Sequence, residues 1–198
     1  MTRKPLFFFA FLLLLSCRPL PQLAEDHKHS PYINYPCIFV SPEKDAKNPV
    51  EILFVKTDTL DNSIRKEISV VFVDEDLPFF FFDWCYDAYR RNHYRRKKDI
   101  ESFVLYYSAA TDALDSVAFP STFSRDQRFR KNMVTHFSQT FPGSAFRLTD
   151  SRPVIFVNTW NHMFSPVDEN PGMKKDSLFA GWLRKGSRAD AESYFRRK

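Results

Sequence analysis

Glycine is scarce in this sequence: 198 residues contain only four, at positions 143, 172, 181 and 186. Loops that bind phosphate and turns that bind dinucleotides need glycines at fixed spacings, because the backbone must approach the phosphate groups. Neither the GxGxxG nor the GxxxxGK[ST] pattern occurs in the chain. The scarcity of glycine therefore argues against a P-loop or Rossmann nucleotide-binding enzyme.

Cysteine and histidine are also few, with three and five copies respectively. They show none of the paired spacings that are typical of a zinc site, and we expect neither a metal nor a cofactor. Apolar runs are short as well. After residue 15 no stretch reaches eighteen apolar residues, so the sequence predicts no membrane-spanning helix in the remainder of the chain.

The first seventeen residues carry the clearest signal. Arg3 and Lys4 precede an apolar run at 6–15, whose ten residues would span roughly 15 Å as a helix, against a hydrocarbon core of about 30 Å. This layout is typical of an export signal over residues 1–16. Its end, Leu14-Leu15-Ser16-Cys17, resembles the lipobox of bacterial lipoproteins. The resemblance implies that Cys17 is diacylated and becomes the mature N-terminus.

A lipid on Cys17 would hold the protein at the membrane of the cell envelope. Arg18 follows the cysteine, where an aspartate would resemble an inner-membrane retention signal, so the outer membrane is the favoured location. Residues 17–36 are polar and punctuated by proline, which indicates a flexible tether. One globular domain is expected over 37–198.

The charge of the exported chain is mild. The full sequence has 29 basic and 24 acidic residues, and removal of Arg3 and Lys4 leaves a net charge of +3. Neither this balance nor an envelope location favours nucleic acid as a partner.

The remaining cysteines, Cys37 and Cys85, form an even pair in an oxidising compartment. A disulfide between them would close a loop of about 49 residues and stabilise the fold by about 4 kcal/mol. Two buried thiols, or a reactive Cys85, are the alternatives.

The pattern of apolar residues predicts an α+β fold: a single domain with a mostly antiparallel sheet packed against two to four helices. Runs rich in β-branched and aromatic residues predict strands at 37–40, 50–56, 67–73, 101–107, 145–148 and 153–160. Helices are predicted at 84–98, at 124–141, from Asp176 through Leu183, and from Ser187 to Arg197. The aromatic run 79–82 suggests either a buried strand or a loop that dips into the membrane.

The helix at 124–141 has the strongest pattern. Ser124 and Gln127 fit a capping box. Phe129, Met133, Phe137 and Phe141 then repeat every four residues, which predicts an apolar stripe for the core. Pro142-Gly143 would end the helix.

Cys85 is the one candidate nucleophile. It follows an apolar run at the predicted start of a helix, where a thiolate is stabilised, and His93, His136 and His162 lie downstream as candidate bases. The order of cysteine and histidine looks distantly like that of the NlpC/P60 cell-wall peptidases, which would imply a cysteine hydrolase. The bulky Trp84 and Tyr86 depart from the small residues that flank the cysteine in that family. A structural role for Cys85 is the alternative.

Two further segments are candidate binding surfaces. Asn158, Trp160, Asn161 and His162 place amide, indole and imidazole groups at a strand end, as a sugar or peptide site would need, or they form a turn. Arg90, Arg91, Arg95, Arg96, Lys97 and Lys98 crowd one segment, which could bind anionic lipid or lipopolysaccharide, or form a solvated helix face.

Together these observations predict a lipid-anchored envelope protein with a non-catalytic binding domain. Its partner would be an anionic lipid, lipopolysaccharide or another envelope protein. An envelope hydrolase that uses Cys85 with His136 or His162 is the alternative.

Overall fold

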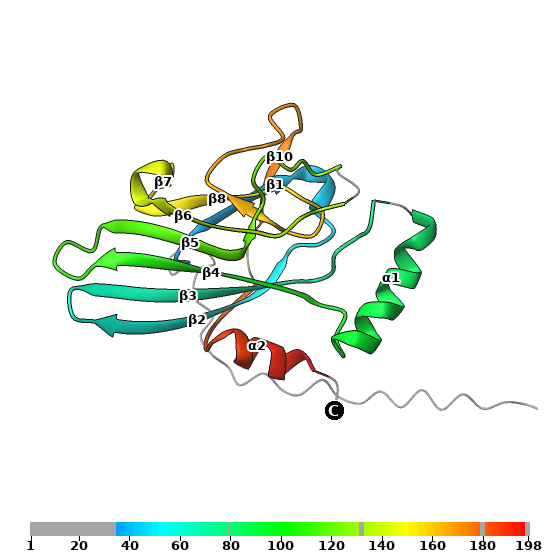
Figure 1. The fold of residues 1–198 in the computed structure, drawn as a ribbon, viewed down its shortest axis with the longest axis horizontal. Helices are drawn as coiled ribbons and strands as arrows, with labels where there is room; N and C mark the ends of the chain where they lie inside the picture. The colour runs from blue at the N-terminus through cyan, green and yellow to red at the C-terminus, as the bar shows by residue number, and fades with distance from the viewer. Residues whose placement is uncertain (1–34, 79, 131–132, 179–180, 197–198) are drawn as a thin grey trace, which may run out of the picture. The chain divides into compact units, whose positions relative to one another are not determined.

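The computed structural model describes residues 35–198, apart from 79, 131–132, 179–180 and 197–198 (Figure 1). The proposed signal, Cys17 and most of the tether therefore lie outside the described residues. In chain order the strands are β1 (Ile38–Pro42), β2 (Val50–Leu60), β3 (Ser63–Phe72), β4 (Asp99–Ser108), β5 (Leu114–Phe123), β6 (Phe137–Pro142), β7 (Leu148–Thr149), β8 (Arg152–Val157), β9 (Phe164–Ser165), β10 (Lys175–Leu178) and β11 (Trp182–Lys185). The helices are α1 (Phe80–His93) and α2 (Arg188–Phe195), with short 3₁₀ turns η1 (Glu43–Asp45) and η2 (Gly143–Ala145). None of the described helices is long and apolar enough to cross a membrane.

One curled, mixed sheet dominates the molecule. Its strands follow the order β10-β1-β8-β9-β5-β4-β3-β2-β11, with β6 paired to β5 and β7 to β8. Strands β2 to β5 form an antiparallel meander (Figure 1). The pairs β1·β8, β2·β11 and β5·β9 are parallel. The α+β prediction is therefore wrong: the fold is a sheet-dominated half-barrel with only two α-helices among the described residues.

The concave side of the sheet is filled by aromatic side chains. Phe39, Phe103, Phe119 and Phe164 are each no more than 2% exposed and come from four different strands. Phe103 and Phe164 meet edge-to-face, with ring centroids 5.3 Å apart, a geometry that aromatic quadrupoles favour. This core accounts for part of the abundance of phenylalanine in the chain.

The helix expected at 124–141 does not form. Phe137 and Phe141 lie instead on β6, where they pair with Phe123 and Val117 of β5. A four-residue repeat places side chains on one face of a helix, but four is also twice the two-residue period of a strand. The repeat was therefore compatible with both structures, and pairing with β5 decided between them.

The segment from Asp176 to Leu183 also differs from its prediction. Its described residues lie mostly in β10 and β11, which pair with β1 and β2, and residues 179–180 lie outside the described residues. Both partners would otherwise present an unpaired edge of N–H and C=O groups, so pairing satisfies more backbone groups than a short helix would. The start of the last helix is confirmed, because Ser187 caps α2 in a capping box with Asp190. The helix ends at Phe195, and Arg197, its predicted end, lies outside the described residues.

The described part of the aromatic run at 79–82 is not a strand either, and Phe79 lies outside the described residues. Helix α1 begins at Phe80, and Phe82 is 62% exposed on it. The helix expected at 84–98 ends at His93, where Tyr94 and Arg95 turn the chain, Arg95 with a φ of 56°. The basic residues that follow therefore lie in a loop that leads into β4.

Candidate functional site

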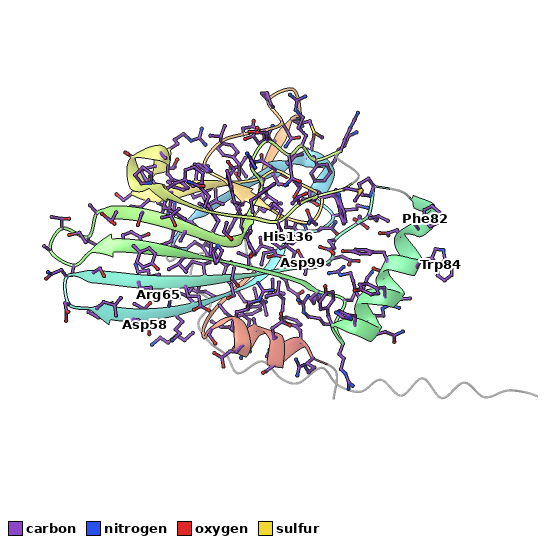
Figure 2. The ribbon with its side chains drawn as sticks, viewed as in Figure 1. Asp58, Arg65, Phe82, Trp84, Asp99 and His136 are labelled. Atoms are coloured by element: carbon purple, nitrogen blue, oxygen red, sulfur yellow. The ribbon has the colours of Figure 1, made fainter. Side chains whose placement is uncertain are left out.

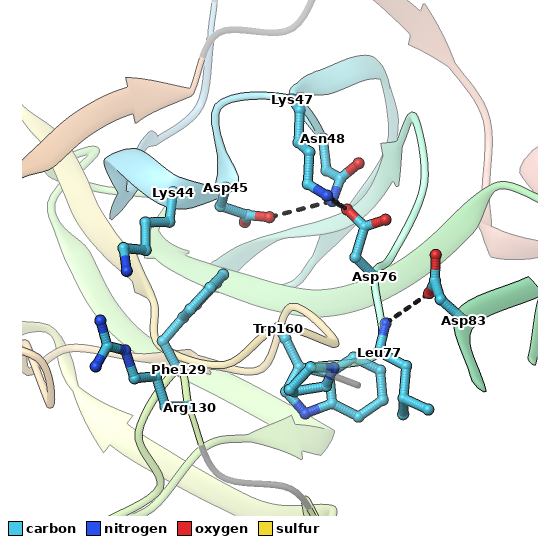
Figure 3. A pocket seen from close by; sticks show the side chains of 11 residues that line it. Lys44, Asp45, Lys47, Asn48, Asp76, Leu77, Asp83, Phe129, Arg130 and Trp160 are labelled. Carbon is cyan, nitrogen blue, oxygen red and sulfur yellow. Dashed lines mark hydrogen bonds and ion pairs between the residues drawn. The ribbon is translucent and has the colours of Figure 1, made fainter. Parts of the chain in front are cut away.

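A cleft of about 330 Å³ opens between four segments that are far apart in the sequence (Figure 3). The segments are the η1 turn with the residues that follow it, the connection from β3 to α1 with the first turn of α1, the loop before β6, and the turn between β8 and β9. Its lining residues are Lys44, Asp45, Lys47, Asn48, Asp76, Leu77, Pro78, Asp83, Phe129, Arg130 and Trp160. A cleft of this size holds a small molecule.

The two ends of the cleft differ in charge. In Figure 3 the charged ends of Lys44 and Arg130 lie on one side, next to Phe129, and the carboxylates of Asp76 and Asp83 lie on the other. Within the part of the chain that the structure describes, no ion pair engages Lys44 or Arg130. These two cations are therefore available to an anionic group of a ligand.

The acidic end is already held by the protein. Asp76 accepts from Lys47 at 2.7 Å and from Asn48 at 2.6 Å. Burial alone would raise the pKa of Asp76, but these two partners outweigh it and lower that pKa. Asp83 accepts the backbone N–H of Leu77 at 2.9 Å, which ties the start of α1 to the cleft. The two carboxylates at this end are therefore held by protein groups and are not free to bind a ligand.

Asp45 connects the cleft to the protein interior. Its side chain lines the cleft but is almost fully buried, and Ser41 Oγ donates to it at 3.0 Å. The same carboxylate lies 3.4 Å from Nε2 of His162. A ligand that contacts Asp45 in the cleft would therefore also affect the buried His162, because both contact the same carboxylate.

His162 lies between two carboxylates with no solvent exposure. Its Nδ1 is 2.8 Å from Asp99 Oδ2, and its ring stacks on Phe72 with centroids 3.7 Å apart. Burial alone would lower the pKa of His162, but Asp45 and Asp99 outweigh this effect and raise that pKa to about 10. The ring is therefore a buried imidazolium near neutral pH, and it cannot serve as a general base there.

A second group of charges adjoins the histidine. Arg90 of α1 is buried, 3.0 Å from Asp74 and 3.4 Å from Glu75. Tyr86 donates a hydrogen bond to Glu75, and its ring meets that of Trp160 edge-to-face. Burial and the charge of Asp99 together raise the pKa of Glu75 to about 7, although Arg90 and Tyr86 act in the opposite direction. Trp160 is thus the second wall residue of the cleft that touches this network.

Glu75, Asp99 and His162 could hold a metal ion by composition, since their ligand atoms lie within 4.8 Å of one another. Arg90 and the imidazolium already supply positive charge to these carboxylates. A divalent cation would have to displace the proton of His162 and sit beside the guanidinium. The arrangement is better described as a buried ion-pair network.

The residues of the hydrolase hypothesis are not brought together. Cys85 is exposed on α1, and His93 lies eight residues further along the same helix, about 12 Å away. His162 is enclosed by Asp45 and Asp99. His136 is exposed, with Nδ1 2.9 Å from the carbonyl of Ser121. No described histidine makes a hydrogen bond to Cys85.

The predicted disulfide is absent as well. Cys37 is a buried free thiol in the aromatic core, and Cys85 is an exposed one. Burial raises the pKa of the Cys37 thiol, so this cysteine is an inert core residue rather than a nucleophile.

The strand end predicted to bind a sugar or peptide contributes one residue to the cleft. Asn158 is buried and fixes two loops, donating to Ser124 and Val167 and accepting from Glu169. Asn161 is buried and accepts from Thr159. The turn interpretation therefore accounts for both asparagines and for His162, whose φ of 57° belongs to a turn. Trp160 alone reaches the cleft.

Most of the basic segment is engaged in ion pairs within the domain, and two of its six residues, Arg90 and Arg96, are buried. Arg90 is paired with Asp74, Arg96 with Glu192, Lys97 with Asp74 and Asp87, and Lys98 with Glu51. Arg91 and Arg95 remain at the surface.

Sequence reasoning missed Lys44, Asp45, Glu75 and Arg130. These residues form no motif, because they come from separate connections, and their proximity is set only by the curl of the sheet. A comparison with known proteins identifies no relative: no family model, no curated protein and no solved structure matches the chain.

Proposed function

We propose that the chain is a lipid-anchored envelope protein whose domain binds a small anionic ligand without transforming it. The observation that carries the binding role is the cleft, where Lys44 and Arg130 lie beside Phe129 at one end and form no ion pair with any described residue. The lipobox at Cys17 supports the anchor. The hydrolase alternative finds no support among the described residues, because Cys85 and the histidines lie apart.

The ligand that fits this cleft combines an anionic group with a ring or apolar face. The anionic group would lie between Lys44 and Arg130, where charge-assisted hydrogen bonds are strong. Its ring would face Phe129 and Trp160, as aromatic walls favour. Acidic sugars and short peptides with a free carboxylate have this chemistry.

A matched pair of sugars tests the proposal. Glucuronate and glucose share a ring, but only glucuronate carries a carboxylate. We expect glucuronate to bind more tightly than glucose, as measured by calorimetry and by the change in tryptophan fluorescence. In the double variant Lys44→Gln, Arg130→Gln this preference should disappear.

Lys174→Gln is the control variant, because Lys174 is an exposed lysine that is paired with Glu43 outside the cleft. It should leave the preference for glucuronate intact. Equal binding of both sugars by the unaltered protein, or a preference that survives the double substitution, would refute the proposed site.

A further inference from the structure

Helix α1 presents an unusually apolar outer face. Phe82, Trp84 and Tyr89 are 62%, 71% and 52% exposed. In Figure 2 the side chains of Phe82 and Trp84 point away from the rest of the molecule. Three large aromatic side chains exposed on one helix mark an interaction surface.

These residues form a continuous arc around the helix. At 3.6 residues per turn, Trp84, Ala88, Cys85, Tyr89 and Phe82 span about 160°. Asn92, near the end of the helix, is the one polar residue inside this arc among the side chains that the structure describes. The arc is wide enough for the helix to lie flat on an apolar surface.

The opposite face of α1 attaches the helix to the domain through polar contacts. Asp83 accepts from Leu77, Tyr86 donates to Glu75, and Arg90 pairs with Asp74. The described core clusters contain none of the exposed aromatic residues of α1. Packing within the domain therefore does not explain why these positions are aromatic.

The positive charges beside the arc favour an anionic partner. Arg91 lies at one edge, with its side chain 49% exposed, and Arg95 is exposed just beyond the helix. Both acids of the described helix, Asp83 and Asp87, are on the inner face and only partly exposed. Among the described side chains of α1, the outer surface thus combines aromatic side chains with cations and carries no carboxylate.

We infer that the outer face of α1 docks on an anionic phospholipid surface. Tryptophan and tyrosine favour the boundary between headgroups and acyl chains, and arginine favours anionic headgroups. The choice of lipid over a protein rests on the proposed anchor. The 17 residues between Cys17 and Tyr35 could span at most about 60 Å, which keeps the domain beside the bilayer.

The depth of Trp84 tests this inference. The full chain, extracted from membranes, is reconstituted into phosphatidylethanolamine–phosphatidylglycerol vesicles with either brominated or plain acyl chains. Bromine quenches only those indoles that enter the bilayer. We expect a loss of tryptophan fluorescence in the brominated vesicles, which disappears in Trp84→Phe and weakens in Arg91→Gln, Arg95→Gln.

Trp182→Phe is the matched control, because Trp182 is 45% exposed on β11 and should contribute nothing to the quenching. Equal fluorescence in brominated and plain vesicles would overturn the inference. Trp84 that is unquenched by bromine, yet shielded from acrylamide in native membranes, would also overturn it and identify a protein partner.

Intact mass spectrometry of the same preparation separates this inference from the proposed anchor. Acyl chains on Cys17 together with quenching of Trp84 support both. Quenching without acylation supports the docking of α1 and refutes the anchor. Acylation without quenching refutes the docking alone, and the absence of both refutes both.

Discussion

Arg90 shows how far burial changes the meaning of a residue. In the sequence it is one of six basic residues, but its side chain is 2% exposed and lies between Asp74 and Glu75. Burial alone would lower the pKa of Arg90, yet the neighbouring carboxylates outweigh burial and raise it. The charge of Arg90 balances carboxylates inside the protein, whereas the charge of Arg91 lies at the protein surface.

The two neighbouring arginines should therefore respond differently to the same substitution. Arg90→Met would leave the buried Glu75 without its cation and Asp74 with Lys97 alone, and we expect a loss of about 3–5 kcal/mol in the free energy of unfolding. Arg91→Met removes only a surface pair at 3.7 Å with Asp87 and should cost less than about 1 kcal/mol. Urea denaturation measures both. Equal losses would contradict the buried network.

His162 should make the stability of the protein depend on pH. Its pKa is about 10 in the folded protein against about 6.5 unfolded. The stabilisation is therefore complete below pH 6.5 and is lost as the pH rises towards 10. The free energy of unfolding then falls by at most about 1.4 kcal/mol per pH unit, because one proton is involved. Glu75, with a folded pKa of about 7, acts in the same direction between about pH 4.5 and 7.

Urea midpoints measured from pH 5 to 10 test this dependence. His162→Asn should be less stable at pH 6 but should show a flatter decline above pH 7, and asparagine tolerates the positive φ of this position. His136→Asn changes an exposed histidine and should keep the decline of the unaltered protein. An unchanged slope in His162→Asn would rule out the buried imidazolium.

At the scale of elements, periodicity alone did not distinguish a helix from a strand. The repeat of Phe129, Met133, Phe137 and Phe141 matched a helical stripe, but Phe137 and Phe141 lie on β6. Ser187 and Asp190 cap α2 as expected, whereas Ser124 and Gln127, which fit the same pattern, start no helix, and the chain after them pairs with β5. A capping box depends on four neighbouring residues, whereas a strand depends on the partner beside it.

The turn η2 packs closely against the start of β5. A Cβ added to Gly143 would lie 2.1 Å from the carbonyl oxygen of Leu114, at the start of β5. Gly143→Ala must therefore shift backbone, and we expect it to cost roughly 1–3 kcal/mol of stability. Gly172 has open space around its Cα, so Gly172→Ala should change stability by less than about 0.5 kcal/mol. Thermal denaturation compares the two; equal melting temperatures would show that the contact relaxes freely.

At the scale of the whole molecule, the sheet is what assembles the cleft. Four stretches of the chain meet there, and they contribute residues 44, 45, 47 and 48, residues 76–78 and 83, residues 129 and 130, and residue 160. Asp45 and Trp160 then link the cleft to His162 and Tyr86. A ligand in the cleft would thus contact the same groups that hold α1 and the buried charges in place.

The sequence by itself determined the features that depend on neighbouring residues: the lipobox resemblance at Cys17, which remains a prediction, the central strands, the cap of α2, and the lack of a nucleotide-binding loop. Only the tertiary structure decided that Arg90 and Arg96 are buried, that Cys85 is separate from the histidines, and that β10 and β11 close the sheet edges. The physical reason is the distance along the chain between the residues that interact. Caps and turns are set by hydrogen bonds within a few residues, whereas ion pairs, sheet edges and clefts join segments whose proximity exists only after the chain has folded.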